Sequence, residues 1–446
     1  MSGATKALGR SEEITAVWPS QRHAWITALL LMLAYTLAFV DRQALSLLVQ
    51  PIKDDLGVSD TAMSLLYGLS FTLFYVAIGI PIAWVADRAN RRNIVVGSIL
   101  IWSVATTCCG FARSYATLFT ARVAVGAGEG GLSPAGYSML ADCFPKERLA
   151  LAMGVYNMGV YFGGAGALIL GGLIAGAIPP GESVAIPLLG MVKGWQVIFF
   201  LLGLPGILLA LAMTLVREPM RHGVVAAPGR GTPIADLFGQ LRRHARPYFG
   251  IMVGFALMIL VGNSTGAWIP VFLERSYGMS ISQIGHAYGL IVFFCGTSGA
   301  LVGGLVAGKL NRLGRTRGNL EAAIIGFSVL IPLTIGFPLM PTPFLALAAI
   351  GGMNFFAGFN FGGGLAALQG LTPNSMRAQI SVIYMLVINV IGATMGPTAV
   401  ALVTDYVFAD PSMVGYSISL VCLVASPLAL AALVFGMTGL AREASQ

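Results

Sequence analysis

The chain has 446 residues, of which 57% are hydrophobic and only 10% are charged. Soluble domains carry about 25% charged residues, so this composition excludes an ordinary soluble protein and indicates an integral membrane protein. Five cysteines without a CxxC pair exclude a disulfide scaffold and a cysteine-based metal site. The formal charge of +8 could indicate a nucleic-acid partner, and the positions of the basic residues along the chain decide whether it does.

Twelve stretches are apolar enough to cross a membrane as helices, since each crossing needs roughly 20 residues. In chain order they cover about 24–50, 60–86, 93–111, 115–141, 149–178, 195–216, 248–273, 282–308, 319–338, 343–371, 378–406 and 415–439. No signal peptide is expected before the first stretch, because residues 1–22 are polar. The sequence therefore predicts an all-α membrane protein with twelve transmembrane helices.

The basic residues lie mostly on one side of this predicted topology. Twenty of the 26 Lys and Arg residues fall on the side of the N-terminus, and two more, Arg42 and Arg122, lie within crossings. The four on the opposite side are Lys53, Arg113, Lys193 and Arg275. Cytoplasmic loops are the ones enriched in Lys and Arg, so both termini are predicted to be cytoplasmic. The positive charge therefore reflects topology, and no nucleic-acid partner is expected.

The longest predicted loop on the cytoplasmic side follows the sixth crossing. It is rich in arginine, proline and glycine, which favours a flexible linker. The predicted organisation is an N-terminal bundle of six helices over 1–216, a cytoplasmic linker over 217–247, and a C-terminal bundle of six helices over 248–446.

Matching loops occur at matching places in the two halves. The chain reads AWVADRANRR over 83–92 after the second crossing and GLVAGKLNR over 304–312 after the eighth. Short loops with a proline and a basic residue follow the fourth crossing (142–148) and the tenth (372–377). Such matches indicate internal duplication. The pattern resembles the major facilitator superfamily over essentially the whole chain, which implies two pseudo-symmetric bundles that rock about a central cavity.

The loop after the second crossing resembles the best-known motif of that superfamily, with an acidic residue followed by spaced basic residues. Ala83 stands where a glycine is usual, and Gly308 replaces the acid in the second copy. A carboxylate there can pair with arginines and hold the cytoplasmic ends of helices together. The alternative is that the basic run only anchors the topology. The predicted cytoplasmic gate consists of Asp87, Arg88, Arg91, Arg92, Asp142 and Arg148.

Four ionisable residues lie well inside predicted crossings: Asp41 and Arg42 in the first, and Arg122 and Glu129 in the fourth. Each such charge costs roughly 2.5–3.5 kcal/mol near the bilayer centre, so the four are expected to face one another or a hydrated cavity. Asp41 and Arg122 lie at similar predicted depths, which makes them plausible partners, and Arg42 and Glu129 complete an alternating ladder. One interpretation is a static cluster of salt bridges. The other is a proton-coupling site, because burial disfavours the charged form of a carboxylate and buried ion pairs stabilise proteins poorly.

The residues around these charges narrow the resemblance. FVDRQ over 39–43 and RVAVGAGEGGLSP over 122–134 are similar to the spinster branch of the superfamily. That resemblance implies transport of lysolipids or sphingosine-phosphate-like molecules, and the short loops indicate a bacterial homologue in the inner membrane. The second half of the chain is less similar to this branch, so it says less about the substrate.

The predicted substrate site has a charged half and a neutral half. Asp41 and Glu129 are assigned to proton coupling, and Arg42 and Arg122 to an anionic head group. Other predicted cavity residues are polar or aromatic, although any single phenylalanine is more easily explained by packing or lipid contact. These cavity residues are Tyr35, Asn157, Tyr161, Asn263, Asn354, Phe359, Asn360, Tyr384 and Asn389.

The sequence as a whole predicts a proton-coupled secondary transporter of amphipathic, anionic lipid-like molecules that works by alternating access. Two alternatives remain open: a proton-coupled transporter of small organic anions or drugs, and an uncoupled lipid facilitator or scramblase. No enzyme is expected, since no residues form a nucleophile, metal or cofactor site. The expected partners are the lipid bilayer and the substrate, the expected energy source is the proton gradient, and the chain is expected to act as a monomer.

Overall fold

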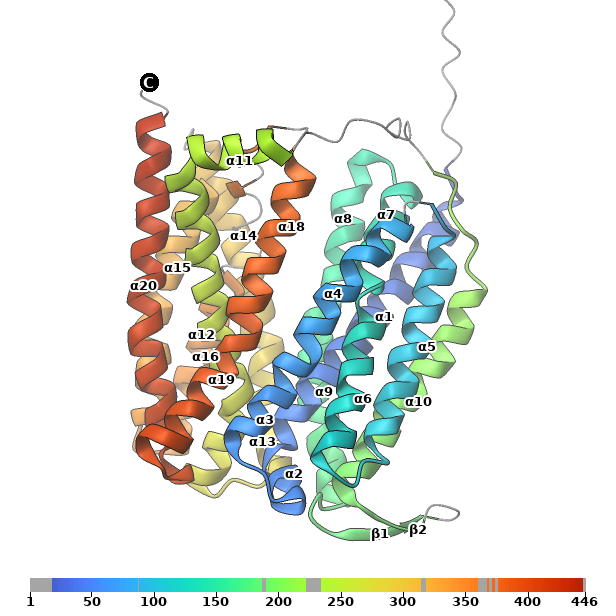
Figure 1. Cartoon of the computed structure of the whole chain (residues 1–446), viewed down its shortest axis with the longest axis vertical. Helices are drawn as coiled ribbons and strands as arrows, with labels where there is room; N and C mark the ends of the chain where they lie inside the picture. Colours follow the sequence, from blue (N-terminus) through green and yellow to red (C-terminus); the bar gives the residue numbers. More distant parts are fainter. Residues whose placement is uncertain are drawn as a thin grey trace, which may run out of the picture.

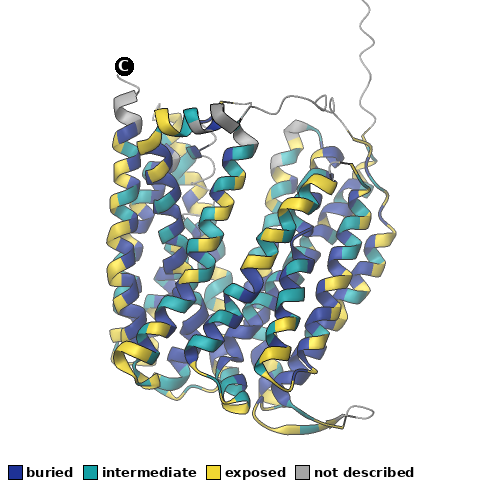
Figure 2. Ribbon diagram, in the orientation of Figure 1, coloured by how far each residue is buried: buried dark blue, intermediate teal, exposed yellow. Residues whose placement is uncertain are grey.

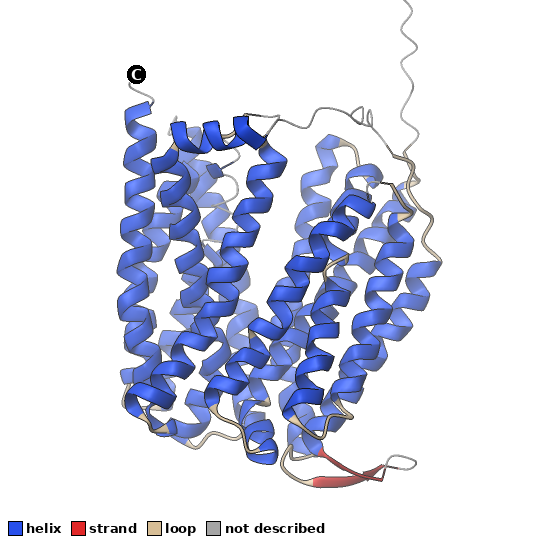
Figure 3. Ribbon diagram, viewed as in Figure 1, coloured by secondary structure: helices blue, strands red, loops and turns tan. Residues whose placement is uncertain are grey.

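The computed structural model describes residues 18–86, 88–186, 190–221, 234–313, 318–359, 367–368, 371–373 and 376–443. Within these residues the chain is almost entirely helical (Figure 3). The helices lie in two groups side by side, with the first half of the sequence in one group and the second half in the other (Figure 1).

The first group contains helices α1 to α10 and one small hairpin. Its elements are α1 (Gln21–Leu47), α2 (Val49–Leu56), α3 (Asp60–Tyr67), α4 (Leu69–Ala86), α5 (Arg91–Cys109), α6 (Tyr115–Glu129), α7 (Leu132–Cys143), α8 (Lys146–Asn157), α9 (Gly159–Ala177), β1 (Ser183–Ile186), β2 (Gly190–Lys193) and α10 (Gly194–Thr214).

The second group contains the other described helices, together with three π-helical segments (η1, η3 and η4) and two short 3-10 helices (η2 and η5). Its elements are α11 (Ile234–Arg243), α12 (Ala245–Tyr277), α13 (Ile281–Ile291), η1 (Val292–Gly296), α14 (Thr297–Arg312), α15 (Gly318–Gly336), η2 (Phe337–Leu339), α16 (Pro343–Phe359), α18 (Arg377–Val387), η3 (Ile388–Thr394), α19 (Met395–Leu402), η4 (Val403–Phe408), η5 (Pro411–Met413) and α20 (Val414–Glu443).

The twelve predicted crossings all correspond to helices in the described residues. Ten helices or continuous helix pairs are long and apolar enough to cross a membrane, and their ranges match ten of the predicted stretches. The crossing predicted over 115–141 is divided into α6 and α7 at Gly130 and Gly131. The crossing predicted over 343–371 begins with the shorter apolar helix Pro343–Phe359. The prediction of an all-α membrane fold is therefore confirmed.

One element was not predicted from the sequence. Strands β1 and β2 form an antiparallel hairpin between α9 and α10, with Ser183 opposite Lys193 and Ile186 opposite Gly190. The segment is too short and too poor in alternating residues to give a recognisable strand pattern. We call the end of the molecule that carries this hairpin the hairpin end.

The opposite end is called the terminal end, because α1 begins there at Gln21 and α20 ends there at Glu443 (Figure 1). That both ends of the chain lie on one side of the membrane stays a prediction. Helix α11 lies across the terminal end of the second group (Figure 1).

The two groups are joined at the hairpin end. Arg275 of α12 donates to both oxygens of Asp60 of α3, at 2.7 and 2.8 Å. The backbone N–H and hydroxyl of Thr61 donate to Asp405, at 2.7 and 2.6 Å. Helices α9 and α13 also approach closely there, since a Cβ added to Gly172 would lie 3.0 Å from the Cα of Gly285. Small residues allow this closeness, as the glycine-rich fifth crossing suggests.

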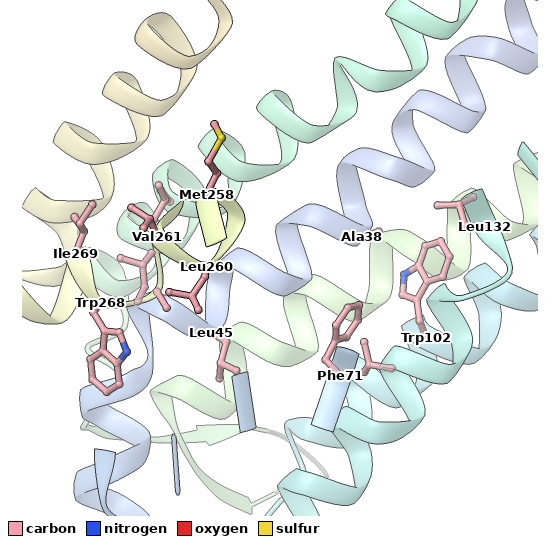
Figure 4. Close-up of a cluster of buried hydrophobic side chains, with 14 of the residues drawn as sticks. Ala38, Leu45, Phe71, Trp102, Leu132, Met258, Leu260, Val261, Trp268 and Ile269 are labelled. Atoms are coloured by element: carbon pink, nitrogen blue, oxygen red, sulfur yellow. The ribbon is translucent and has the colours of Figure 1, made fainter. Parts of the chain in front are cut away.

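Buried apolar side chains continue from one group of helices to the other. Leu45 of α1, Phe71 of α4, and Val261 and Trp268 of α12 belong to one cluster (Figure 4). Exposed residues follow the outward faces of the helices (Figure 2). Many of the exposed side chains are large and apolar, as for Leu208 of α10, which is 69% exposed. A surface of this kind suits contact with lipid chains rather than with water.

Candidate substrate and proton-coupling site

Two consecutive residues of α1 reach two different places on α6. Successive side chains of a helix point about 100° apart, so Asp41 and Arg42 cannot share one partner. On α6, Arg122 and Glu129 are seven residues apart and therefore lie on one face, about 10 Å from each other along the axis. The two charges of α1 are only about 1.5 Å apart along their own axis, so the directions of their side chains, and not matching heights, allow both pairs to form.

The first pair is Asp41 with Arg122. Arg122 Nη1 donates to Asp41 Oδ2 at 2.7 Å, and Thr106 Oγ1 of α5 donates to Asp41 Oδ1 at 2.9 Å. Asp41 and Arg122 are both buried, at 3% and 1% exposure. The predicted partnership of these two residues is therefore present in the structure.

The second pair is Arg42 with Glu129. Arg42 donates to Glu129 Oε2 from Nε at 2.8 Å and from Nη2 at 2.5 Å. The other carboxylate oxygen, Oε1, is buried and has no hydrogen-bond partner among the described residues. The Glu129 side chain is fully buried, whereas the Arg42 side chain is 24% exposed.

Aromatic rings surround the guanidinium of Arg42. Its Cζ lies 4.9 Å from the ring centre of Phe39, 4.4 Å from that of Phe71 and 4.9 Å from that of Tyr75. An arginine over aromatic faces gains about 0.5–2 kcal/mol from each favourable contact. The rings also give the space beside the charge an apolar lining.

Two glycines explain why α6 can carry these charges between its neighbours. A Cβ added to Gly126 would collide with the backbone carbonyl of Phe71, and one added to Gly128 would lie 2.7 Å from the backbone N of Trp102. Only glycine permits both close approaches. The GxGE pattern therefore brings Glu129 within reach of Arg42 by packing α6 tightly against α4 and α5.

Three residues of this site were not singled out from the sequence: Thr106, Phe71 and Tyr75. A threonine and two aromatic residues are common in transmembrane helices, so composition gives no signal for them. The spacing of Phe71 and Tyr75 by four residues does place both rings on one face of α4.

The predicted cavity residues belong to both groups of helices. The side-chain amides of Asn157, Asn263, Asn354 and Asn389 each donate to the carbonyl of the residue four positions earlier. Tyr384 is 5% exposed. Asn360 lies outside the described residues.

The aromatic cavity residues pack against neighbouring rings or small residues. Tyr35 stacks on Tyr156 with ring centres 4.6 Å apart. Tyr161 of α9 faces η1, because a Cβ added to Gly296 would lie 3.3 Å from its ring. Phe359 lies at the end of α16, with its ring centre 6.0 Å from that of Phe356. That these residues line one substrate cavity stays a prediction.

Part of the predicted gate forms a compact network at the terminal end. Arg91 is 1% exposed and contacts Asp142 and Glu218, the latter at 2.8 Å. Its guanidinium also donates to the carbonyls of Ser138 and Pro219. These partners all belong to the first half of the chain, so the network ties α5 and α7 to the segment after α10.

The other predicted gate residues behave differently. The backbone N–H of Arg92 donates to Glu218 at 2.8 Å, while Arg88 lies over the ring of Trp84 at 3.9 Å. Arg148 is exposed, and Asp87 lies outside the described residues. Glu218 was not predicted, because it lies in a loop that the sequence marks only as basic.

The comparisons with known proteins agree with this architecture. Residues 31–397 match the family model of the Major Facilitator Superfamily. The chain belongs to the major facilitator superfamily. An "MFS-type efflux pump" of Mycolicibacterium smegmatis is 30% identical over 411 residues, which cover 91% of this chain and 90% of the relative. The superfamily and this relative are transporters.

Two further comparisons point to different branches of the superfamily. The "Probable galactarate/D-glucarate transporter GudP" of Escherichia coli is 25% identical, covering 65% of this chain and 66% of the relative. A crystal structure of a bacterial homologue of the human lysosomal transporter Spinster, in an inward-facing and unoccupied conformation, is 27% identical. It covers 94% of this chain and 96% of its own, with a TM-score of 0.72. The chain is thus a transporter of the major facilitator superfamily that is similar both to a spinster homologue and to proteins named as acid-sugar transporters, and the resemblance to the spinster branch is confirmed.

Proposed function

We propose that this protein is a proton-coupled secondary transporter of amphipathic anions of the lysolipid or sphingoid-phosphate kind, working by alternating access. The observation that carries the proposal is the Arg42–Glu129 pair, in which a partly exposed guanidinium is neutralised by one oxygen of a buried carboxylate. Such an arginine can bind an external anion once the carboxylate of its partner, Glu129, is neutralised.

The charge balance of the four residues gives the coupling. With two acids and two bases ionised, the cluster is neutral. Protonation of Glu129 leaves one uncompensated positive charge at Arg42, which attracts an anionic head group. Loss of that proton restores the internal pair and releases the anion. One proton and one negative charge therefore bind together, and they are carried in the same direction.

The surroundings of Arg42 favour an amphipathic substrate. The rings of Phe39, Phe71 and Tyr75 leave an apolar surface next to the cation. On the second group, the predicted cavity residues are neutral or aromatic, including Asn354 and Phe359. A head group at Arg42 and an apolar tail against the second group would use both chemistries.

Small organic anions are the second candidate. Several similar proteins carry names such as galactarate/D-glucarate transporter and, in Bacillus subtilis, hexuronate transporter. The same arginine would bind a sugar carboxylate, with the polar side chains of the second group accepting hydroxyl groups. Competition between a lysolipid and a glucarate for the purified transporter separates the two candidates.

The decisive experiment is transport by proteoliposomes under an imposed pH gradient, with Glu129→Gln as the test variant. Glutamine imitates the protonated residue, so we expect this variant to lose accumulation driven by the gradient while it still exchanges labelled substrate across the membrane. Glu182→Gln, in the exposed turn before β1, is the matched control. Full accumulation by Glu129→Gln would exclude the proton role, and wild-type transport unaffected by the gradient would indicate an uncoupled facilitator.

We propose further that the terminal end faces the cytoplasm of a bacterial inner membrane, so that the joined hairpin end corresponds to an inward-facing state. The distribution of Lys and Arg supports this orientation. A cysteine placed at exposed Gly181, in a background without native cysteines, should react with an impermeant thiol reagent in intact cells. A cysteine at exposed Arg148 should react only after the membrane is opened.

A further inference from the structure

An apolar groove runs between α5 and α6 on the outer face of the first group, toward the hairpin end. It is a largely open groove with a volume of about 910 Å³. The residues that line it are Leu100, Ile101, Val104, Ala105, Cys108, Phe111 and Ala112 of α5 and the segment after it, and Ala116, Thr117, Thr120, Ala121 and Ala124 of α6. This volume lies within the range of about 300–1,000 Å³ that is usual for sites of small ligands.

The groove lies beyond a close contact between the two helices. At Gly128 the backbones of α6 and α5 nearly touch, with an added Cβ only 2.7 Å from the N of Trp102. Farther along, α6 presents Ala116, Ala121 and Ala124, whose small side chains leave the space open. On the α6 side the groove is therefore formed in part by alanines, which have no rotamers that could close it.

The two polar residues of the groove do not make it hydrophilic. The hydroxyl of Thr117 donates to the carbonyl of Ser114 at 2.8 Å, and that of Thr120 donates to the carbonyl of Ala116 at 2.8 Å. Because both hydroxyls are satisfied within the helix, the groove offers apolar atoms to an occupant.

The length of the groove matches one leaflet of a bilayer. Ala124 lies nine residues from the start of α6, and Leu100 lies nine residues from the end of α5, which is about 14 Å in each helix. Half of a hydrocarbon core of about 30 Å is about 15 Å. An extended chain that enters at the hairpin end would therefore reach the middle of the membrane.

A basic residue follows directly after the part of the chain that lines the groove at the end of α5. Arg113 lies between the lining residues Phe111, Ala112 and Ala116, is exposed, and forms no ion pair among the described residues. The other basic residues predicted at this end are paired: Lys53 and Arg275 with Asp60, and Lys193 with Asp55 at 3.8 Å. The positive end of the α6 helix also begins there, at Tyr115.

We infer that this groove binds an anionic phospholipid of the leaflet at the hairpin end, with one acyl chain between α5 and α6 and the phosphate at Arg113. The inference is independent of the transported substrate. The site backs onto the buried charges, since Ala105 and Ala121 line the groove while Thr106 and Arg122, the next residue of each helix, contact Asp41.

The test is a titration of the purified, delipidated full chain with phosphatidylglycerol, followed by native mass spectrometry and by the melting temperature. A lipid that binds only the folded protein raises that temperature. We expect phosphatidylcholine with the same chains to bind more weakly. Arg113→Gln should weaken binding of phosphatidylglycerol about fivefold, as expected for one basic residue near a membrane surface. Lys193→Gln, which removes a paired charge at the same end, should not change it.

Two further variants test the groove itself. Ala116→Phe fills it and should abolish binding of one phosphatidylglycerol molecule, and Ala121→Leu gives a milder filling in case the first variant folds poorly. Ala431→Phe, at an exposed position of α20, is the matched control. Lipids bound by basic residues elsewhere add the same number of bound molecules to the wild type, the filled variants and the control. Equal binding of phosphatidylcholine, or undiminished binding of phosphatidylglycerol by both filled variants, would overturn the inference.

Discussion

The two ion pairs between α1 and α6 consist of the same residue types but differ in their surroundings. Asp41 and Arg122 are both buried, and a third residue, Thr106, donates to the free oxygen of the acid. Arg42 and Glu129 share a single carboxylate oxygen, and Arg42 remains 24% exposed within a set of aromatic rings. Arg122 Nε and Glu129 Oε1 are the atoms of these pairs that lack a partner among the described residues.

This difference indicates two roles: a holding role, in which a pair stabilises the fold, and an exchanging role, in which a pair opens to bind an anion. Separating a buried pair in which both acid oxygens accept hydrogen bonds costs much free energy, because each charge would be left in an apolar site. A pair with an accessible arginine can exchange its internal carboxylate for an external anion. We therefore assign stability mainly to Asp41–Arg122 and transport mainly to Arg42–Glu129, and four predictions test this assignment.

The largest expected effect is the loss of one member of the buried pair. Asp41→Leu leaves the Arg122 charge buried and alone, which should cost about 3–5 kcal/mol of folding stability. The measurement is thermal unfolding of the purified protein in detergent. The double variant Asp41→Leu/Arg122→Leu removes both charges and should recover most of the loss. An equal loss in the single and double variants would contradict the holding role.

Removing the accessible arginine should affect the substrate more than the fold. Arg42→Gln loses charge-assisted hydrogen bonds to an anionic head group, worth about 1.5–3 kcal/mol each, so KM should rise roughly ten- to hundredfold. The melting temperature should fall less than for Asp41→Leu, because the buried Glu129 left behind can be neutralised by a proton, whereas the Arg122 left behind by Asp41→Leu stays charged. Transport at varied substrate concentration measures the first effect, and an unchanged KM would refute the assignment to the head group.

A smaller effect is expected at the residue that supports the buried pair. Thr106→Val keeps the shape of the side chain but removes the hydrogen bond to Asp41 Oδ1, at a cost of about 1.5 kcal/mol of folding stability. Thr120→Val is the matched control, since its hydroxyl bonds only within its own helix. Comparable losses in the two variants would show that Asp41 does not depend on Thr106.

The smallest effect concerns the aromatic rings around Arg42. Phe71→Leu keeps an apolar side chain but removes the ring at 4.4 Å, which should weaken substrate binding by about 0.5–1 kcal/mol, or roughly two- to fivefold in KM. Phe293→Leu, whose ring packs near Phe162 at the contact between the groups, serves as the control. If the two variants have the same KM, the rings around Arg42 contribute nothing specific to binding.

Much of the fold was predictable because a membrane imposes simple requirements on a sequence. A crossing helix must be apolar over about 20 residues, so composition along the chain predicted the crossings, including the long α12. Composition did not predict that Gly130 and Gly131 divide one crossing into two helices. It also missed the hairpin, which lies outside the apolar stretches.

Part of the site was also predictable, since charges in a membrane must find partners. Equal depth on two helices was enough to pair Asp41 with Arg122. Depth alone, however, does not give the direction of a side chain, and neutral residues carry no comparable signal. Thr106, Phe71 and Tyr75 were for this reason not anticipated, and neither was Glu218 as the partner of Arg91.

The sequence by itself determined the membrane fold, the two halves and the four intramembrane charges, because each follows from the cost of placing polar groups in hydrocarbon. Only the tertiary structure decided which charge is enclosed and which can be reached, because that depends on how closely α4, α5 and α6 pack around Gly126 and Gly128. Helices α5 and α6 also line the apolar groove, where α6 presents small side chains between its start and those glycines.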